Sequence, residues 1–283
     1  MRDKKNLRKN LAVSGVIEAL LLVALASIIL STIQLTYIPQ IMNDRESEHM
    51  DQVSNQFSYL KAMIEIQSIT QSDVVISSPI TLGSTELPYF ITAWATGEIT
   101  IPNDKFKITV NPGLAATYLG SIKYEAKNSY FIDQTYILEA GGVVLIQPDG
   151  SAMRVLPSIS VENTSDVTLD FRLYNIEGVT GKDSSGGAQK ETYYLYTNFS
   201  SSTMYPQFQN ITSARVYTLS PNAWWSALNY TLGRSVNLSR EISDDPEFSF
   251  YIKIVPNAKF GKPTHLDLEI VDIRAQVGPG RLI

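Results

Sequence analysis

The longest apolar run of the chain lies close to its N-terminus. From Val16 to Ile33 the only charged residue is Glu18, and at 1.5 Å per helical residue this run covers about 27 Å, close to the hydrocarbon thickness of a bilayer. The pattern predicts one transmembrane helix over residues 16–38, which contacts membrane lipid through residues 16–33. A secretory signal peptide has a shorter apolar core, of about 7–15 residues, and then a small-residue cleavage site. The following STIQLTYIPQ offers no such site.

A second helix is predicted over residues 39–72. Pro39 should kink or interrupt the helix where it leaves the membrane, because proline removes one backbone hydrogen bond and crowds the preceding turn. Beyond Pro39, apolar residues recur at spacings of three and four, which places them in one stripe on a helix. The stripe consists of Met50, Val53, Phe57, Leu60 and Ile64. It either packs against the domain that follows or forms a seam between chains, and we expect the former because two heptads are few for a coiled coil.

From about residue 73 the hydrophobic period changes to two. Short runs rich in β-branched and aromatic residues alternate with Gly, Pro, Asn and Asp, which is typical of a β-sandwich or barrel. Residues 73–283 are therefore predicted to form a β-rich, sandwich-like ectodomain, and a subdivision near residue 155 is left open. We expect a surface loop over residues 181–190 and a short helix over residues 220–233. The expected fold class is mainly β, with an N-terminal transmembrane helix that continues into an extracellular helix.

Charge predicts the orientation of the span. Five basic residues precede it, and a basic flank beside a single apolar span stays on the cytoplasmic side. These residues are Arg2, Lys4, Lys5, Arg8 and Lys9. The N-terminus is thus expected in the cytoplasm and the C-terminal domain outside the cell membrane. The whole chain has a net charge of −5, and without its basic flank the exported domain is more acidic still, which argues against nucleic acid as a partner.

Few residues point to chemistry. The chain has no cysteine and only two histidines, His49 and His265, far apart in sequence. Disulfides and thiolate sites are excluded, and little is left for metal or triad chemistry. Nucleotide-binding, hydrolase and metalloprotease motifs do not occur, so we expect no enzyme, no cofactor and no metal site. The segment SDDPE (residues 243–247) offers oxygens for calcium but lacks the alternating spacing of a calcium loop, and a solvated turn is the simpler interpretation.

Five N-x-S/T sequons lie in the second half of the chain. They begin at Asn163, Asn198, Asn210, Asn229 and Asn237. On an extracellular domain each is a candidate N-glycosylation site. A chance origin in a sequence rich in Ser, Thr and Asn is the alternative.

Glu18 is the one charge inside the apolar run. A carboxylate near the centre of a bilayer costs about 2.5–3.5 kcal/mol, so an acid in such a segment is first treated as functional. If residues 1–15 are a basic leader that is removed after Gly15, the new amine of Val16 lies two residues from Glu18 and favours its ionised form. The alternative is that the Glu18 side chain reaches the inner headgroups of a slightly shifted span.

Two resemblances concern this part of the chain and the ectodomain. A short basic leader ending in glycine, followed by a long apolar helix with an early Glu, resembles the class III signal of type IV pilins and archaeal pilin-like proteins, and AVSGVIEALLL is similar to their AVSxVIG opening. Cleavage after Gly15 makes Glu18 the third mature residue, whereas the pilin pattern has its Glu at the fifth. The segments YIPQIMNDRESEH, SSPITLGSTELPYF and DQTYILEAGGVVLIQPDG are similar to an uncharacterised family of archaeal membrane-anchored surface proteins with pilin-like N-termini. This resemblance implies an archaeal source, a single-pass topology and a β-rich ectodomain, and it supplies no catalytic residue.

The expected function is structural. The observations predict a non-catalytic cell-surface protein, a pilin-like structural or accessory subunit that associates with itself or with pilin-like subunits through its N-terminal apolar helix. The alternative is a monomeric membrane-anchored ectodomain that binds a surface polymer or glycan through exposed aromatic residues. Candidates for that role are Tyr193, Tyr194, Tyr196 and Trp225.

Overall fold

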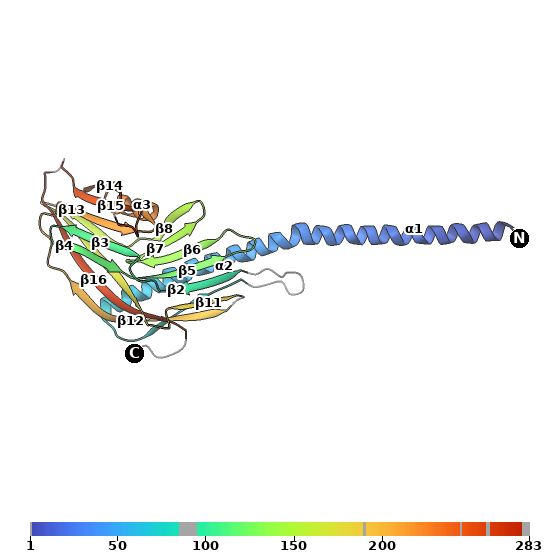
Figure 1. Cartoon of the computed structure of the whole chain (residues 1–283), viewed down its shortest axis with the longest axis horizontal. Coiled ribbons are helices and arrows are strands. Elements are labelled where there is room, and N and C mark those ends of the chain that lie inside the picture. The colour runs from blue at the N-terminus through green and yellow to red at the C-terminus, as the bar shows by residue number, and fades with distance from the viewer. Residues whose placement is uncertain (1, 85–94, 189–190, 244, 259–260, 279–283) are drawn as a thin grey trace.

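One long helix leads from the N-terminus into a β domain (Figure 1). The computed structural model describes residues 2–84, 95–188, 191–243, 245–258 and 261–278, with the backbone alone for residues 2–14 and 188. The helix is made of α1 (Arg2–Thr32), a π-helical turn η1 (Ile33–Tyr37) and α2 (Ile38–Thr70). The structure confirms the predicted fold class, mainly β behind a long apolar N-terminal helix.

Pro39 does not end the helix. It is the second residue of α2, directly after the π-helical turn, in which the Ile38 N–H donates to the carbonyl of Ile33, five residues back. In a regular α-helix the proline ring would crowd the carbonyl of Leu35. The wider π turn accommodates the ring, so the α-helical ladder is interrupted over Ile33–Tyr37, next to Pro39 as predicted, and the helix continues beyond it.

The β domain contains three sheets. Sheet A has the order β1 (Ile76–Thr81), β12 (Thr192–Met204), β16 (Thr264–Val277), β10 (Val167–Gly178) and β9 (Ser158–Asn163). Sheet B has the order β11 (Ser184–Ala188), β2 (Thr96–Thr100), β5 (Ser121–Lys127), β6 (Gln134–Glu139), β7 (Gly142–Gln147) and β8 (Gly150–Val155). Sheet C has the order β14 (Val236–Ile242), β15 (Phe250–Pro256), β13 (Ser213–Thr218), β3 (Phe106–Asn111) and β4 (Leu114–Leu119). Each sheet combines strands from both sides of residue 155, so the sheets do not separate there.

Two hydrophobic cores lie on opposite faces of sheet A. The first core joins sheet A to sheet C, to Val144 of β7 in sheet B and to α3 (Pro221–Leu232), the short helix expected after the Ser-Pro pair. The second core joins sheet A to sheet B and to α2. Sheet A is therefore shared, and the three sheets form one continuous β domain.

The central strands of sheet A serve both cores by changing the face that is apolar. On β16 the buried alternation runs through Leu266 and Leu268 to Ile270 in the first core, and then restarts at Val271 in the second. On β10 the same change falls between Leu173 and Tyr174. Because side chains alternate between faces along a strand, one step out of phase moves the apolar face from one side of the sheet to the other. β10 and β16 are parallel, and Leu173 pairs with Ile270, so both strands switch at the same level.

α2 packs on its own β domain. The five residues of the predicted stripe, Met50, Val53, Phe57, Leu60 and Ile64, are all at most 1 % exposed and belong to the second core. The helix is also held by polar contacts near its C-terminal end, where Gln67 donates to the Thr197 carbonyl at 2.7 Å and accepts from the Thr197 hydroxyl at 2.9 Å. No side of this stripe is left open for a second chain.

The expected loop over residues 181–190 contains a strand. β11 is an edge strand of sheet B and pairs with all five residues of β2. Its two glycines reduce its intrinsic β propensity, but pairing uses backbone groups alone, and tertiary context often outweighs propensity in sheets. Leu82 and Glu191 crowd the position that a Cβ on Gly187 would occupy, so a small residue fits this edge.

Removal of a stripe side chain should destabilise the protein. Phe57→Ala and Leu60→Ala should each lower the free energy of unfolding by about 2–5 kcal/mol, because each leaves a cavity in the second core. Urea unfolding of the full chain in detergent micelles, followed by tryptophan fluorescence, measures the change. Tyr59→Ala is the matched control, since Tyr59 lies between them in sequence but is 48 % exposed. Equal unfolding midpoints for all three variants would contradict the packing.

Candidate functional site

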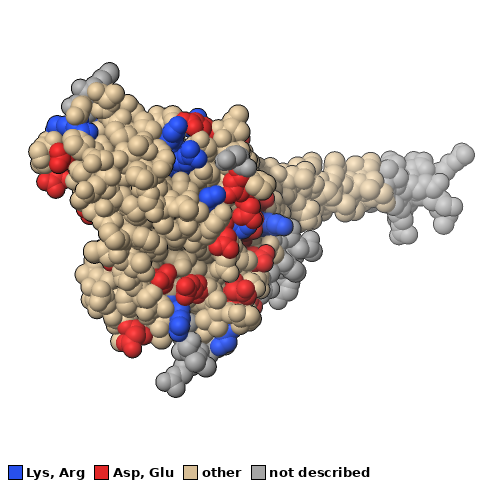
Figure 2. Space-filling view, turned by 60° about the vertical axis from the view of Figure 1, so that its left-hand side comes forward, with Lys and Arg blue, Asp and Glu red and all other residues tan. Residues whose placement is uncertain are grey.

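The helix segment that projects from the β domain is the largest apolar surface of the described chain. Every side chain from residue 15 to residue 37 is exposed, with Leu35 at 78 % and Tyr37 at 63 %, and Ile38 is the first buried side chain along the described part of the helix. The face of this segment seen in Figure 2 carries no charged side chain, whereas acidic and basic residues are spread over the β domain. The segment is about 35 Å long at 1.5 Å per residue.

The segment has the length and composition of a membrane span. Within the described ranges, the helix over residues 15–70 alone is apolar and long enough to cross a membrane, and its most apolar window is entirely unburied. A helix from the core of a water-soluble domain would be covered by other elements. Because an apolar surface of this size is unfavourable in water, it must be covered by lipid or by other protein.

Gly15, Val16 and Glu18 all lie on this exposed segment. Among the residues whose side chains the structure describes, none forms a hydrogen bond or an ion pair with Glu18. A Cβ added at Gly15 would meet no atom within 4 Å. The sequence-predicted processing and assembly residues are therefore together and accessible, and the carboxylate of Glu18 is open to a partner from outside the described chain.

A second carboxylate, Glu46, holds the β domain to the helix where the helix leaves it. Its side chain is fully buried and accepts three backbone N–H groups from the β5–β6 turn. The donors are Ser129 at 3.1 Å, Tyr130 at 2.7 Å and Phe131 at 2.6 Å. Three backbone donors satisfy a buried carboxylate well, so this contact fixes the turn to α2.

Glu46 was not among the residues singled out from the sequence, although a signal was present. It lies four residues before Met50 and thus on the apolar stripe of α2. A single acid on a buried helix face requires a dedicated partner. The partner is the backbone of residues 129–131, which no sequence pattern identifies.

A third carboxylate, Glu139, lies where sheet B meets sheet C and α3. It is 1 % exposed and accepts hydrogen bonds from the Thr218 hydroxyl at 2.8 Å and from Trp224 Nε1 at 2.6 Å. Burial raises the pKa of Glu139 to about 7, and the two hydrogen bonds oppose that rise without cancelling it. The Glu139 carboxylate therefore links sheet B to sheet C and α3 through hydrogen bonds, away from solvent.

The sequon asparagines differ in accessibility. Asn163, Asn210, Asn229 and Asn237 are exposed, on β9, in a turn, on α3 and on β14. Asn198 is half-buried on β12, and its Oδ1 is buried. Asn163 is exposed, but its Nδ2 donates to the Ser235 hydroxyl at 3.3 Å and its Oδ1 accepts from Lys262 Nζ at 2.8 Å, so a glycan there would replace a hydrogen bond. Asn210, Asn229 and Asn237 are the more accessible positions.

The candidate glycan-binding aromatics do not form one platform. Tyr194 and Tyr196 share the outward face of β12, with ring centroids 6.5 Å apart. Tyr193 packs against the second core, and Trp225 packs against the first core from α3. Trp224 is fully buried.

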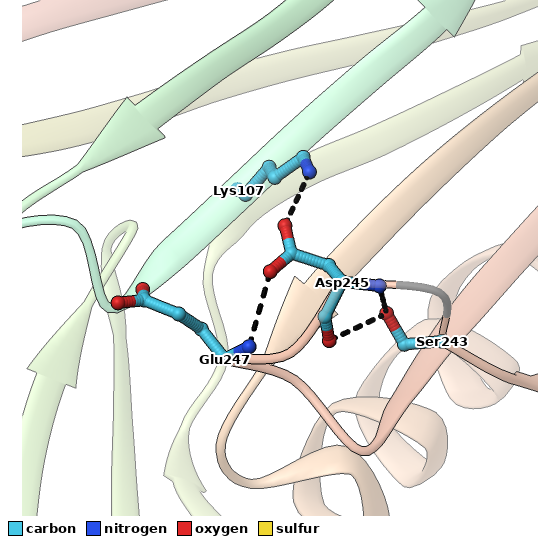
Figure 3. Close-up of polar contacts among 4 residues, drawn as sticks. All are labelled: Lys107, Ser243, Asp245 and Glu247. Atoms are coloured by element: carbon cyan, nitrogen blue, oxygen red, sulfur yellow. Dashed lines mark hydrogen bonds and ion pairs between the residues drawn. The ribbon is translucent and has the colours of Figure 1, made fainter.

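The SDDPE segment forms a turn pinned by a lysine (Figure 3). Asp245 accepts from Lys107 Nζ at 2.6 Å and from the Glu247 N–H at 3.1 Å, and the Ser243 hydroxyl accepts from the Asp245 N–H at 3.0 Å. The hydrogen bond from Lys107 lowers the pKa of the Asp245 carboxyl. Asp244 lies outside the described residues. The Lys107 ammonium neutralises Asp245, which favours the turn interpretation over a calcium site.

A groove of about 630 Å³ lies beside β10 and β16 of sheet A, and charged side chains line part of it. Arg172 Nε donates to Glu269 at 2.5 Å, and Asp170 and Asp267 line the same groove. Among the described residues no group of His, Cys, Asp and Glu has the arrangement needed to hold a metal ion. The ion pair joins two adjacent strands of sheet A, and the Ser202 hydroxyl donates to the same Glu269 carboxylate at 2.8 Å.

Comparison of the chain with protein-family models, curated proteins and solved structures found no match.

The pKa of Glu139 predicts a pH-dependent stability. The ordinary pKa is 4.5 and the folded-state pKa is about 7, so the folded protein binds this proton more tightly than the unfolded chain. Its stabilising effect is complete below the ordinary pKa and is lost as the pH rises through the folded value. The melting temperature of the parent should therefore fall between about pH 5 and pH 8.

Glu139→Gln should remove much of that fall, because the amide keeps an acceptor oxygen and cannot ionise. Thermal unfolding across the pH interval measures it, with the exposed Glu162→Gln as the matched control. A Glu139→Gln variant whose melting temperature falls as steeply as that of the parent would contradict the assignment.

Proposed function

We propose that the protein is a membrane-anchored, pilin-like structural or accessory subunit of the cell surface, which associates through its exposed N-terminal helix. The observation that carries the proposal is the exposed apolar segment over residues 15–37. It is continuous with α2, which buries its apolar stripe in the second core of the β domain. A rigid connection transmits any association of these segments directly to the position of the β domain. The basic flank supports an orientation with the N-terminus in the cytoplasm and the β domain outside.

Glu18 supports association in addition to anchoring. A span that only anchors gains nothing from a carboxylate, because an acid inside the apolar run opposes insertion. Removal of residues 1–15 would place Glu18 in the first turn of the helix. There the free N–H groups and the new amine of Val16 favour a negative charge. The amine of a neighbouring copy, aligned by the same membrane, could pair with Glu18 in the same way.

The alternative is a monomeric anchored ectodomain that binds a surface polymer or glycan. The pair of Tyr194 and Tyr196 on the outward face of β12 is the observation that favours it. Aromatic rings on an exposed sheet face suit the apolar face of a sugar. This function needs neither processing after Gly15 nor the charge of Glu18.

Glu18→Gln separates the two functions. The amide keeps the shape of the side chain and removes its charge, so the variant should insert at least as well as the parent but should crosslink less to neighbouring subunits. Crosslinking in membranes from expressing cells measures association. Glu48→Gln, an exposed acid of α2 beyond the span, is the matched control and should crosslink as the parent does.

Gly15→Val tests processing without disturbing the fold, since a side chain at this position meets no atom within 4 Å. The mass of the mature N-terminus should show loss of residues 1–15 in the parent and their retention in the variant. Should the parent retain Met1 and Glu18→Gln crosslink normally, the anchored ectodomain replaces the pilin-like subunit.

A further inference from the structure

The β5–β6 turn, residues 128–133, lies beside the helix where the helix leaves the β domain (Figure 1). Asn43 Nδ2 donates to the Tyr130 carbonyl at 2.9 Å, one helical turn before the Glu46 carboxylate that binds the same turn. The Asn43 and Glu46 side chains thus tie the N-terminal end of α2 to the turn. The turn therefore cannot move along the helix without breaking a buried carboxylate site.

Hydrogen bonds within the turn fix its shape, and its exposed side chains include the apolar Ile132 beside the polar Ser129 and Asp133. Asp133 accepts from the Asn128 N–H at 2.8 Å, and Asn128 Nδ2 donates to the Ile132 carbonyl at 2.7 Å. Phe131 packs against the second core, which directs the neighbouring Ile132 outward with 47 % of its surface exposed. An exposed isoleucine and a half-buried tyrosine, Tyr130, on a turn fixed from behind are not accounted for by the folding of the β domain.

The position of the turn along the helix corresponds to the lipid headgroups. After Glu18 the next charged residue is Asp44, so the uncharged stretch from Ala19 to Asn43 is about 37 Å long. A hydrocarbon layer is about 30 Å thick and the whole bilayer about 40–45 Å. If the span begins at Glu18, the level of Asn43 and Tyr130 falls about 7 Å beyond the hydrocarbon, at the outer edge of a headgroup layer about 5–7.5 Å thick.

We propose that the β5–β6 turn is a second membrane contact, in which Ile132 and Tyr130 enter the headgroup layer of the leaflet on the side of the β domain. The partner is the lipid surface itself. Tyrosine is enriched at this depth because its ring is apolar and its hydroxyl is hydrated, and an isoleucine beside it can turn its apolar side chain toward the acyl boundary. This inference rests on the membrane-spanning helix of the proposed function, and it adds a defined orientation of the β domain.

Two membrane contacts fix the orientation of the β domain, which a single membrane-spanning helix does not. A single span is free to rotate about its axis and to tilt over a range of about 0–40°. A turn bound to the headgroups on one side of the helix selects one rotation and limits the tilt. Glu46 acts here as a positioning residue, because it holds the turn at a fixed height relative to the span.

The absence of native cysteine allows a direct test. Single-cysteine variants Ile132→Cys, Leu25→Cys and Ile242→Cys of the full chain are labelled with an environment-sensitive fluorophore and placed in phosphatidylcholine nanodiscs. Ile242 is the matched surface control, since it is 81 % exposed on β14, on the far side of the β domain from the projecting helix (Figure 1). Lipids with a quencher on the headgroup or on the acyl chain report the depth of each label.

The label at residue 132 should show blue-shifted emission and stronger quenching by the headgroup quencher than the label at residue 242. The label at residue 25 should be quenched from the acyl chain. If residue 25 lies in the acyl region but residue 132 matches residue 242, the inference fails while the span stands. If residue 25 is not quenched from the acyl chain, the proposed membrane anchor itself fails.

Discussion

The burial of α2 in the second core is the interaction on which the rest of the structure depends. One unbroken helix meets two environments, with the side chains of residues 15–37 exposed and the stripe from Met50 to Ile64 buried between sheets A and B. Most of the stability of a helix in a protein comes from tertiary packing of one face, and α2 obtains it from the β domain. Glu46 near one end and Gln67 near the other then fix its position by hydrogen bonds. The direction of the projecting segment is consequently set by the β domain.

Sheet A makes this arrangement compatible with a second core. An ordinary sandwich sheet buries one face and exposes the other, and α2 would then have to displace sheet C. Here the change of phase between Ile270 and Val271, matched by that between Leu173 and Tyr174, buries the opposite face where α2 and sheet B cover it. Where α2 and sheet B do not cover this second face of sheet A, its positions are polar. Arg172 of β10 and Glu269 of β16 form an ion pair there across the two strands. A single sheet can thereby support a helix on one side and a further sheet on the other.

Periodicity predicted the elements but not their partners. The stripe of α2, the short helix α3 and the β-rich domain follow from local spacing, and the phase change is itself visible in THLDLEIVDIRAQV. The strand β11 was predicted as a loop because pairing with β2 depends on a neighbour distant in sequence. Pro39 was expected to kink or interrupt the helix, but sequence alone did not specify that the chain would widen one turn and continue as a helix. Glu46 and Glu139 were missed for a similar reason, since their donors lie more than 75 residues away.

Two carboxylates buried in the β domain and the exposed Glu18 have contrasting surroundings. Glu46 is satisfied by three backbone N–H groups and Glu139 by a hydroxyl and an indole N–H, so within the β domain this chain supplies donors to each buried acid. Glu18 has no such donor among the described side chains, and in a membrane its charge would have less favourable surroundings than in water. A fold that satisfies two acids internally and presents a third on an open helix leaves the donor to come from elsewhere. The candidates are a headgroup, a newly formed amine or a second copy, and only the last two make the charge itself useful for assembly.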